Sequence, residues 1–219
     1  MYDPLRGPWL RCLALNPAAP SDVLLRLLDP AAGDAGPLMC AERGLPDPVI
    51  DAALRHPARR IRQALARNEH VDPARLAPLA TDPSGIVRAW LAGAPRPRRR
   101  AVRPLPDDII ITLLTARDGG ADGLLTADEI IQELDFSWQV PQAFHRAAAG
   151  HKNAELRVHA ARQWHLLTRA QRELCSTTPA PRYAKRPGRP TGRSTRTWWK
   201  PPFRRTAASA SCTYSPRAP

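Results

Sequence analysis

A repeat with a period of 26 residues constrains this chain more than any other feature of its sequence. Residues 57–66, PARRIRQALA, align without gaps with residues 83–92, PSGIVRAWLA, so that Leu65 falls on Leu91. A unit of this length is too small to bury an apolar stripe alone, whereas stacked neighbours bury it jointly. The repeat therefore predicts an all-α solenoid, an α-α superhelix, over residues 1–175. An irregular helical bundle is the alternative.

Each unit is predicted to pair an amphipathic helix with a shorter helical turn. Apolar residues at helical spacing place the longer helices at residues 21–28, 47–55, 72–80 and 107–116. Ser21, Asp47 and Asp72 are the expected N-caps of the first three. The shorter turns follow Asp-Pro or His-Pro steps, as at residues 29–30, 56–57 and 82–83. The chain has 25 prolines, which exclude long uninterrupted helices.

Further copies of the repeat core carry a family resemblance. Leu13-Ala14 aligns with the Leu-Ala step at twice the period, and Leu156-Arg157 repeats the aliphatic-Arg step. The N-P or H-P step, the aliphatic-Arg-x-x-Leu-Ala core and the D-P-x-x-Leu helix start resemble the leucine-rich repeat variant family over residues 10–175. These bacterial solenoids alternate an α-helix with a short 3₁₀-helix, and they are also similar to HEAT-type arrays.

The resemblance implies a non-catalytic scaffold that binds a protein partner, which the sequence does not identify. Some members of the family carry an iron–sulfur cluster. Because the spacings of Cys12, Cys40 and Cys175 do not match a cluster pattern, we predict no cofactor of this kind.

The formal net charge of +13 suggests nucleic acid as an alternative partner. Residues 1–175 are nearly balanced, however, whereas residues 176–219 hold ten basic and no acidic residues. The strongest basic segment outside that tail is PRPRRRAVRP, with Arg96, Arg98, Arg99, Arg100 and Arg103. It predicts either a phosphate-binding spot, which Arg62, Arg88 and Arg157 would extend into a stripe, or a solvated linker.

An inserted loop near residues 95–129 interrupts the repeat, and its end resembles an EF-hand loop. Residues 118–129 read DGGADGLLTADE, and acids, glycine and threonine occupy most of the expected positions. The predicted calcium ligands are Asp118, Asp122, Leu124, Thr126 and Glu129. Position 3 is Gly120, which removes one carboxylate. The alternative is that Thr126-Ala127-Asp128-Glu129 forms a capping box for the following helix.

The sequence predicts neither an enzyme nor a membrane protein. No nucleophile–base pair, phosphate loop or H-E-x-x-H motif occurs, and His145, His151, His159 and His165 lack metal-binding spacing. A HEAT-like DNA-repair glycosylase is the weakest alternative, because no catalytic carboxylate and aromatic arrangement stands out. Without an apolar run near the ~18 residues of a membrane span, we expect a cytoplasmic protein. The tryptophans at 9, 90, 138 and 164 are expected in the core or at caps.

Residues 176–219 differ abruptly from the rest of the chain. They contain no Leu, Ile, Val, Asp or Glu, whereas residues 1–175 contain 25 leucines. This composition predicts a disordered basic tail rich in proline and arginine. A reading-frame shift in a GC-rich gene is a sharper explanation. With plausible codons, reading one base earlier restores an Asp-Pro and an aliphatic-Arg step. A solenoid cut short there would expose its last apolar face.

Overall fold

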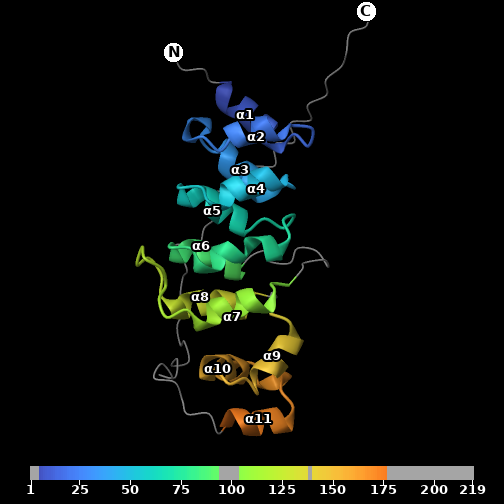
Figure 1. The fold of residues 1–219 in the computed structure, drawn as a ribbon, viewed down its shortest axis with the longest axis vertical. Coiled ribbons are helices and arrows are strands. Elements are labelled where there is room, and N and C mark those ends of the chain that lie inside the picture. The colour runs from blue at the N-terminus through green and yellow to red at the C-terminus, as the bar shows by residue number, and fades with distance from the viewer. Residues whose placement is uncertain (1–4, 94–103, 138–139, 177–219) are drawn as a thin grey trace, which may run out of the picture. The chain divides into compact units, whose positions relative to one another are not determined.

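The protein is all-helical throughout the residues that its computed structural model describes, which are 5–93, 104–137 and 140–176 (Figure 1). α-Helices and 3₁₀-helices are the only regular elements of these ranges, which confirms the all-α prediction. The chain divides into two units, residues 1–181 and 182–219. The second unit, and with it the predicted disordered tail, lies outside the described residues.

Five helices follow one another as a first row, in which each helix packs on the next: α1 on α3, α3 on α5, α5 on α6 and α6 on α8 (Figure 1). The members of this row are α1 (Arg6–Leu15), α3 (Ala35–Glu42), α5 (Arg59–Ala66), α6 (Gly85–Gly93) and α8 (Ala127–Phe136).

A second row alternates with the first along the chain. It contains α2 (Ser21–Arg26), α4 (Asp47–Leu54), the 3₁₀-helix η2 (Pro73–Thr81) and α7 (Asp107–Thr115), and these also pack in sequence. A short 3₁₀-helix, η1 (Pro30–Ala32), connects α2 to α3. The remaining elements are α9 (Gln142–Ala148), α10 (Ala154–Arg162), η3 (Trp164–Leu166) and α11 (Arg169–Ser176). α10 packs on α7, α9 and α11.

Two buried positions recur at the 26-residue period along the first row. The first holds Ala35, Ile61 and Val87, and the second holds Met39, Leu65 and Leu91. Each of these side chains is at most 4% exposed. Since helices α3, α5 and α6 also pack directly on one another, residues that match in sequence occupy matching places in the core. α3 thus repeats the two buried positions, which the sequence comparison did not detect, although Gly36 stands where α5 has Arg62.

The same two positions continue in α8 and α10. Ile130 and Leu134 are equivalent to Leu156 and Ala160, again 26 residues further on, and all four are buried. The step from Val87 to Ile130 is longer, at 43 residues. The extra length is distributed between residues 94–103, which lie outside the described ranges, and the loop from 116 to 126.

Several predicted helix features are wrong in detail. The amphipathic helix predicted at residues 72–80 is present, but η2 is a 3₁₀-helix and not an α-helix, and it contains Pro78, which has no N–H for an α-helical hydrogen bond. Asp72 does cap it, because its side chain accepts a hydrogen bond from Ala74 N at 3.0 Å. Ser21 and Asp47 are not N-caps, since each is the first residue of its helix and a proline precedes it.

The prediction of shorter helical turns is wrong in two of three cases. A 3₁₀-helix follows Asp29-Pro30 as predicted, whereas the His56-Pro57 and Asp82-Pro83 steps lead into α5 and α6, which are full α-helices. The aromatic prediction is wrong for Trp9 and Trp164, whose exposed fractions are 63% and 43%, while Trp90 packs against the core and Trp138 lies outside the described residues.

Candidate functional site

The repeated arginine binds the backbone of the turn that precedes its own helix. Arg62 Nη1 donates hydrogen bonds to the carbonyl oxygens of His56 and Pro57, at 2.7 and 2.9 Å. Arg157 Nη1 makes the same pair of bonds to the carbonyls of His151 and Lys152. Arg88 Nε donates to the carbonyl of Asp82 at 2.6 Å. In all three units, the carbonyl six residues before the arginine is therefore satisfied by its guanidinium.

The residue at the start of each of these turns is fixed by its own side chain. His56 Nδ1, Asp82 Oδ1 and His151 Nδ1 each accept a hydrogen bond from the backbone N–H two residues further along. A histidine or aspartate followed six residues later by arginine is thus one motif. The sequence comparison aligned the arginines but did not connect them with their histidine or aspartate partners, although the constant spacing gives a detectable signal.

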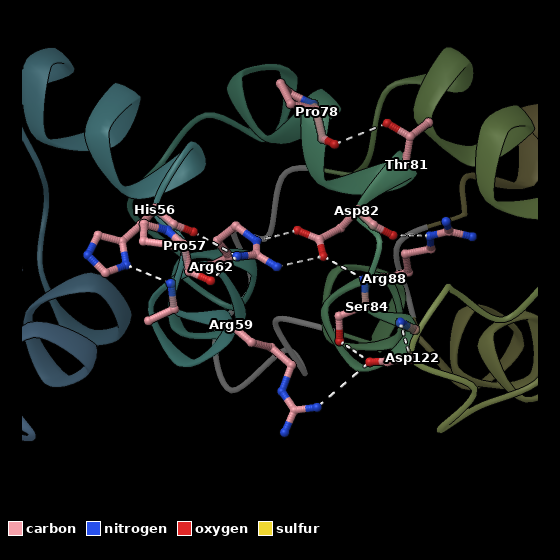
Figure 2. Close-up of polar contacts among 12 residues, drawn as sticks. His56, Pro57, Arg59, Arg62, Pro78, Thr81, Asp82, Ser84, Arg88 and Asp122 are labelled. Carbon is pink, nitrogen blue, oxygen red and sulfur yellow. Dashed lines mark hydrogen bonds and ion pairs between the residues drawn. The ribbon is translucent and has the colours of Figure 1, made fainter. Parts of the chain in front are cut away.

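Asp82 joins two neighbouring units at the centre of a polar network (Figure 2). Its carboxylate binds Arg62 of the preceding unit in a bidentate manner, with Oδ2 at 2.6 Å from Nε and Oδ1 at 3.1 Å from Nη2. The Asp82 side chain is 3% exposed and that of Arg62 is 13% exposed. Because Arg88 binds the Asp82 carbonyl, one aspartate holds the arginines of two units.

A second carboxylate, Asp122, binds the start of α6 from the inserted loop (Figure 2). Asp122 Oδ2 accepts a hydrogen bond from Ser84 Oγ at 2.6 Å, and Oδ1 accepts one from Gly85 N at 3.2 Å. Arg59 Nη1 lies 3.7 Å from Oδ2. The hydrogen bond from Ser84, followed by bonds from backbone N–H groups and the charge of Arg59, holds the pKa of Asp122 below its usual value.

Glycine permits the close approach of this loop to α6. A Cβ on Gly85 would lie 1.8 Å from Gly119 O, and a Cβ on Gly120 would lie 2.3 Å from Gly85 N. Gly120 also has a φ of +117°, a conformation that other residues rarely adopt. The Ala121 N–H donates to Pro83 O at 2.7 Å. The loop is therefore held against α6 by backbone contact as well as by Asp122.

The predicted calcium ligands contribute to these contacts and to a helix cap. Asp118 Oδ1 accepts from Arg88 at 2.8 Å and from Gly120 N, while Asp122 binds α6 as described. Thr126 and Glu129 form a reciprocal capping box at the start of α8, which confirms that predicted cap. Leu124 is 53% exposed. Within the described residues, no group of three or more His, Cys, Asp or Glu side chains is placed to hold a metal ion. The polar side chains among the predicted ligands thus already have partners within the chain, which favours the capping-box interpretation over calcium binding.

The predicted nucleic-acid segment lies outside the described residues, since Arg96, Arg98, Arg99, Arg100 and Arg103 all fall within 94–103. The three arginines expected to extend it are engaged with their own chain. Arg88, like Arg62, has a side chain that is little exposed, at 12%. Their hydrogen bonds to carbonyl oxygens leave few donors for a phosphate.

A histidine pair that sequence spacing did not reveal lies among α8, α9 and α10. The rings of His145 and His159 stack with centroids 5.0 Å apart and an interplanar angle of 20°. Both residues are buried, and His159 Nδ1 lies 3.2 Å from Asp135 Oδ1. Burial, reinforced by the neighbouring His159, lowers the pKa of His145 to about 4. The residues come from three separate helices, so no linear motif marks them.

Two of the cysteines in the described part of the chain, Cys40 and Cys175, are buried thiols of low reactivity. Burial raises the pKa of Cys40 to about 12, so that it stays a neutral thiol at ordinary pH. Burial also raises the pKa of Cys175. Cys12 is exposed on α1.

No family model, curated protein or solved structure matches this chain. The fold defines its class as an all-helical protein. No helix in the described ranges combines the length and apolar character needed to cross a membrane.

Proposed function

We propose that residues 5–176 form a helical-repeat solenoid that acts as a non-catalytic scaffold and binds a protein partner. The observation that carries this proposal is the recurrence of the same buried positions in α3, α5 and α6 at the 26-residue period. Neighbouring copies pack directly on each other, as stacked units of a solenoid do. The resemblance to leucine-rich repeat variant and HEAT-like arrays agrees with this arrangement.

Helices of the first row also leave residues in solvent, such as Arg60 on α5. On a stack of units such residues would line a long surface. Solenoids use surfaces of this kind to bind extended partners. Because the polar groups of the Asp82 network bind one another, that network supports the scaffold and is not available as a catalytic centre.

The placement of the repeated arginines favours a protein partner over nucleic acid. A phosphate-binding stripe needs guanidinium groups that point into solvent. Arg62 and Arg88 instead donate to backbone carbonyls and to the carboxylates of Asp82 and Asp118. Nucleic-acid binding through Arg96 to Arg103 is the second candidate, on the strength of five arginines in eight residues.

Affinity capture with the full chain tests the proposal, with and without nuclease. We expect a specific protein that survives nuclease treatment and is lost when one face is altered. Arg60→Glu on α5 and Arg55→Glu at the end of α4 are matched exposed charge reversals on the two rows. A scaffold partner should respond to one of them and not to the other, while the circular dichroism of both variants stays that of the wild type.

Two outcomes contradict the scaffold function. Loss of every partner on nuclease treatment, together with DNA affinity that falls steeply with added salt, identifies a nucleic-acid-binding protein. The second outcome is that neither charge reversal changes the capture of any partner, which would mean that the partners do not bind these repeat faces.

A further inference from the structure

The histidine pair is buried, lies beside a carboxylate and contains ring nitrogens without hydrogen-bond partners. His145 and His159 are 5% and 2% exposed, and they belong to different helices, α9 and α10. Four buried atoms of the cluster have no hydrogen-bond partner among the described residues: Asp135 Oδ1, His145 Nδ1 and both ring nitrogens of His159. Asp135 Oδ1 and His159 Nδ1 are 3.2 Å apart, close enough for an ion pair once the ring is protonated. The cluster therefore has an unused capacity for protons.

The cluster also departs from the repeat. Asp135 on α8 falls at the position that Ala66 and Ala92 occupy in α5 and α6, where a small apolar side chain is buried. Ala161 holds the equivalent position in α10. A carboxylate at a core position lowers stability unless it is paired, and departures of this kind are expected at functional positions.

The charges around His145 set its response to acid. His159 faces it from α10, Asp135 from α8 and His165 from η3. Asp135 is in addition bound by Arg162 of α10, with Nη1 at 3.3 Å from Oδ2. A proton on His145 would be buried beside the His159 ring, whose centre lies 5.0 Å away, and His159 opposes that proton.

Acid therefore favours any conformation in which His145 reaches solvent. The pKa of an exposed histidine is near 6.5, whereas that of His145 in the folded protein is about 4. Between these pH values the open conformation binds more protons than the closed one, so its share increases as the pH falls. Above pH 6.5 His145 is neutral in both conformations, so proton binding no longer favours the open one.

We propose that the His145–His159 stack, placed beside Asp135, is a proton-sensitive joint that holds α9 against α10 at neutral pH and releases α9 on acidification. α9 is a short helix of seven residues that packs on α10 and η3. Its release would change the surface of the chain near α9 without unfolding α5 and α6, where no such histidine pair occurs among the described residues. The joint does not depend on the identity of the scaffold's partner.

Amide hydrogen exchange of the full chain at pH 7 and pH 5 tests the joint. After correction for the intrinsic pH dependence of exchange, the opening of residues 142–149 should increase about thirtyfold at pH 5. Amides of α5 should show no comparable increase. In His145→Phe, which keeps an aromatic ring in the stack and removes the titrating nitrogen, the acid response of α9 should disappear. His70→Gln alters an exposed histidine and should leave the response intact.

Two results would overturn the proposal. One is equal acid opening of α9 and α5, and the other is an unchanged response in a folded His145→Phe variant. If that variant does not fold, the imidazole resonances of the wild-type chain decide the matter. We expect His145 to remain neutral at pH 5.5 in the closed protein, whereas titration of its ring with an ordinary pKa near 6.5 contradicts the joint.

Discussion

The arginine at the sixth position after a histidine or aspartate illustrates what residue patterns reveal and what they hide. Its recurrence at 62, 88 and 157 is visible in the sequence, but its acceptors are mostly backbone carbonyls. A carbonyl group carries no residue identity, so the pattern was equally consistent with a phosphate-binding stripe. The structure shows that Arg62, Arg88 and Arg157 each bind the turn that precedes their own helix.

Asp82 should contribute much more to stability than Asp72, which also precedes a proline and caps a helix. Asp82→Ala leaves the Arg62 guanidinium buried without its bidentate partner, and we expect a loss of about 3 kcal/mol in the free energy of unfolding. Asp72→Ala removes a cap that also accepts from the N–H two residues on, and should cost about 1 kcal/mol. Urea unfolding followed by circular dichroism measures both. Equal losses would show that the network at Asp82 adds nothing to a simple cap.

Gly85 should not tolerate a side chain. In Gly85→Ala the added methyl group would lie 1.8 Å from Gly119 O, so the inserted loop must move away from α6. We expect a loss of about 3 kcal/mol in the free energy of unfolding. Gly44→Ala is the matched control, because the nearest atom to its added methyl is 4.0 Å away, and it should change stability by less than about 1 kcal/mol. A fully stable Gly85→Ala protein would contradict the close docking of this loop.

The histidine joint shows where prediction from residue patterns ends. His145, His159 and Asp135 have no motif spacing and are brought together only by the packing of α8, α9 and α10. Histidine clustering in the sequence was apparent, but its spacing matched no motif. It could not indicate that two rings stack in the core.

At the scale of elements, apolar spacing located several helices and their ends, but it did not detect every helix or fix the helix type. Helices near 47–55 and 107–116 were predicted within a residue of α4 and α7. α3 was missed, because Gly36 and Pro37 look like helix breakers and Met39-Cys40 replaces the Leu-Ala step. Gly36 is needed there, since a Cβ would lie 2.5 Å from Leu27 O. The apolar spacing within one helix cannot predict such a close contact between two elements.

Equivalent positions in neighbouring helices should respond equally to the same truncation. Leu65 and Leu91 are 0% and 1% exposed at matching places in α5 and α6. We expect Leu65→Ala and Leu91→Ala each to lower the free energy of unfolding by about 3 kcal/mol. Leu25→Ala, at a position 38% exposed, should have a much smaller effect. Chemical denaturation provides the comparison, and strongly unequal losses for the two core leucines would argue against equivalent units.

The inserted loop should behave as a structural connection when calcium is added. Asp118 and Asp122 already bind Arg88 and the start of α6, and Glu129 is part of the capping box of α8. We therefore expect calorimetric titration of the full chain with Ca²⁺ to show no binding heat at about 1 mM. A saturable heat that Glu129→Gln abolishes would instead establish the EF-hand-like site.

At the scale of the whole molecule, the first and last described helices, like Leu124 in the inserted loop, leave large apolar side chains exposed. Trp9 and Leu15 of α1 are 63% and 46% exposed, and Leu174 of α11 is 54% exposed. The interior helices α5 and α6 bury their leucines between neighbours. The all-helical class was predictable from the apolar spacing, and the insertion near residues 95–129 was visible as an interruption of the period, whereas the contact of its loop with α6 required the structure.

Protection against hydrogen exchange should follow this distribution. An array of units loses its end elements first, because each end unit has a neighbour on one side only. We expect amides of α1 and α11 to exchange through local opening, and those of α5 and α6 to be the most protected. Exchange mass spectrometry at neutral pH measures the gradient. Uniform protection from α1 to α11 would indicate one cooperative globule and would reject the repeat array.

The hydrogen bonds between the repeated arginine and the turn before its helix have an evolutionary consequence. Since most of its bonds are made inside one unit, a copy of that unit inherits a complete fastening when the gene segment is duplicated. Recombination between such segments can then lengthen or shorten the protein without new residues having to arise at the junction. The 26-residue spacing between Arg62 in α5 and Arg88 in α6 is what such a history would leave behind.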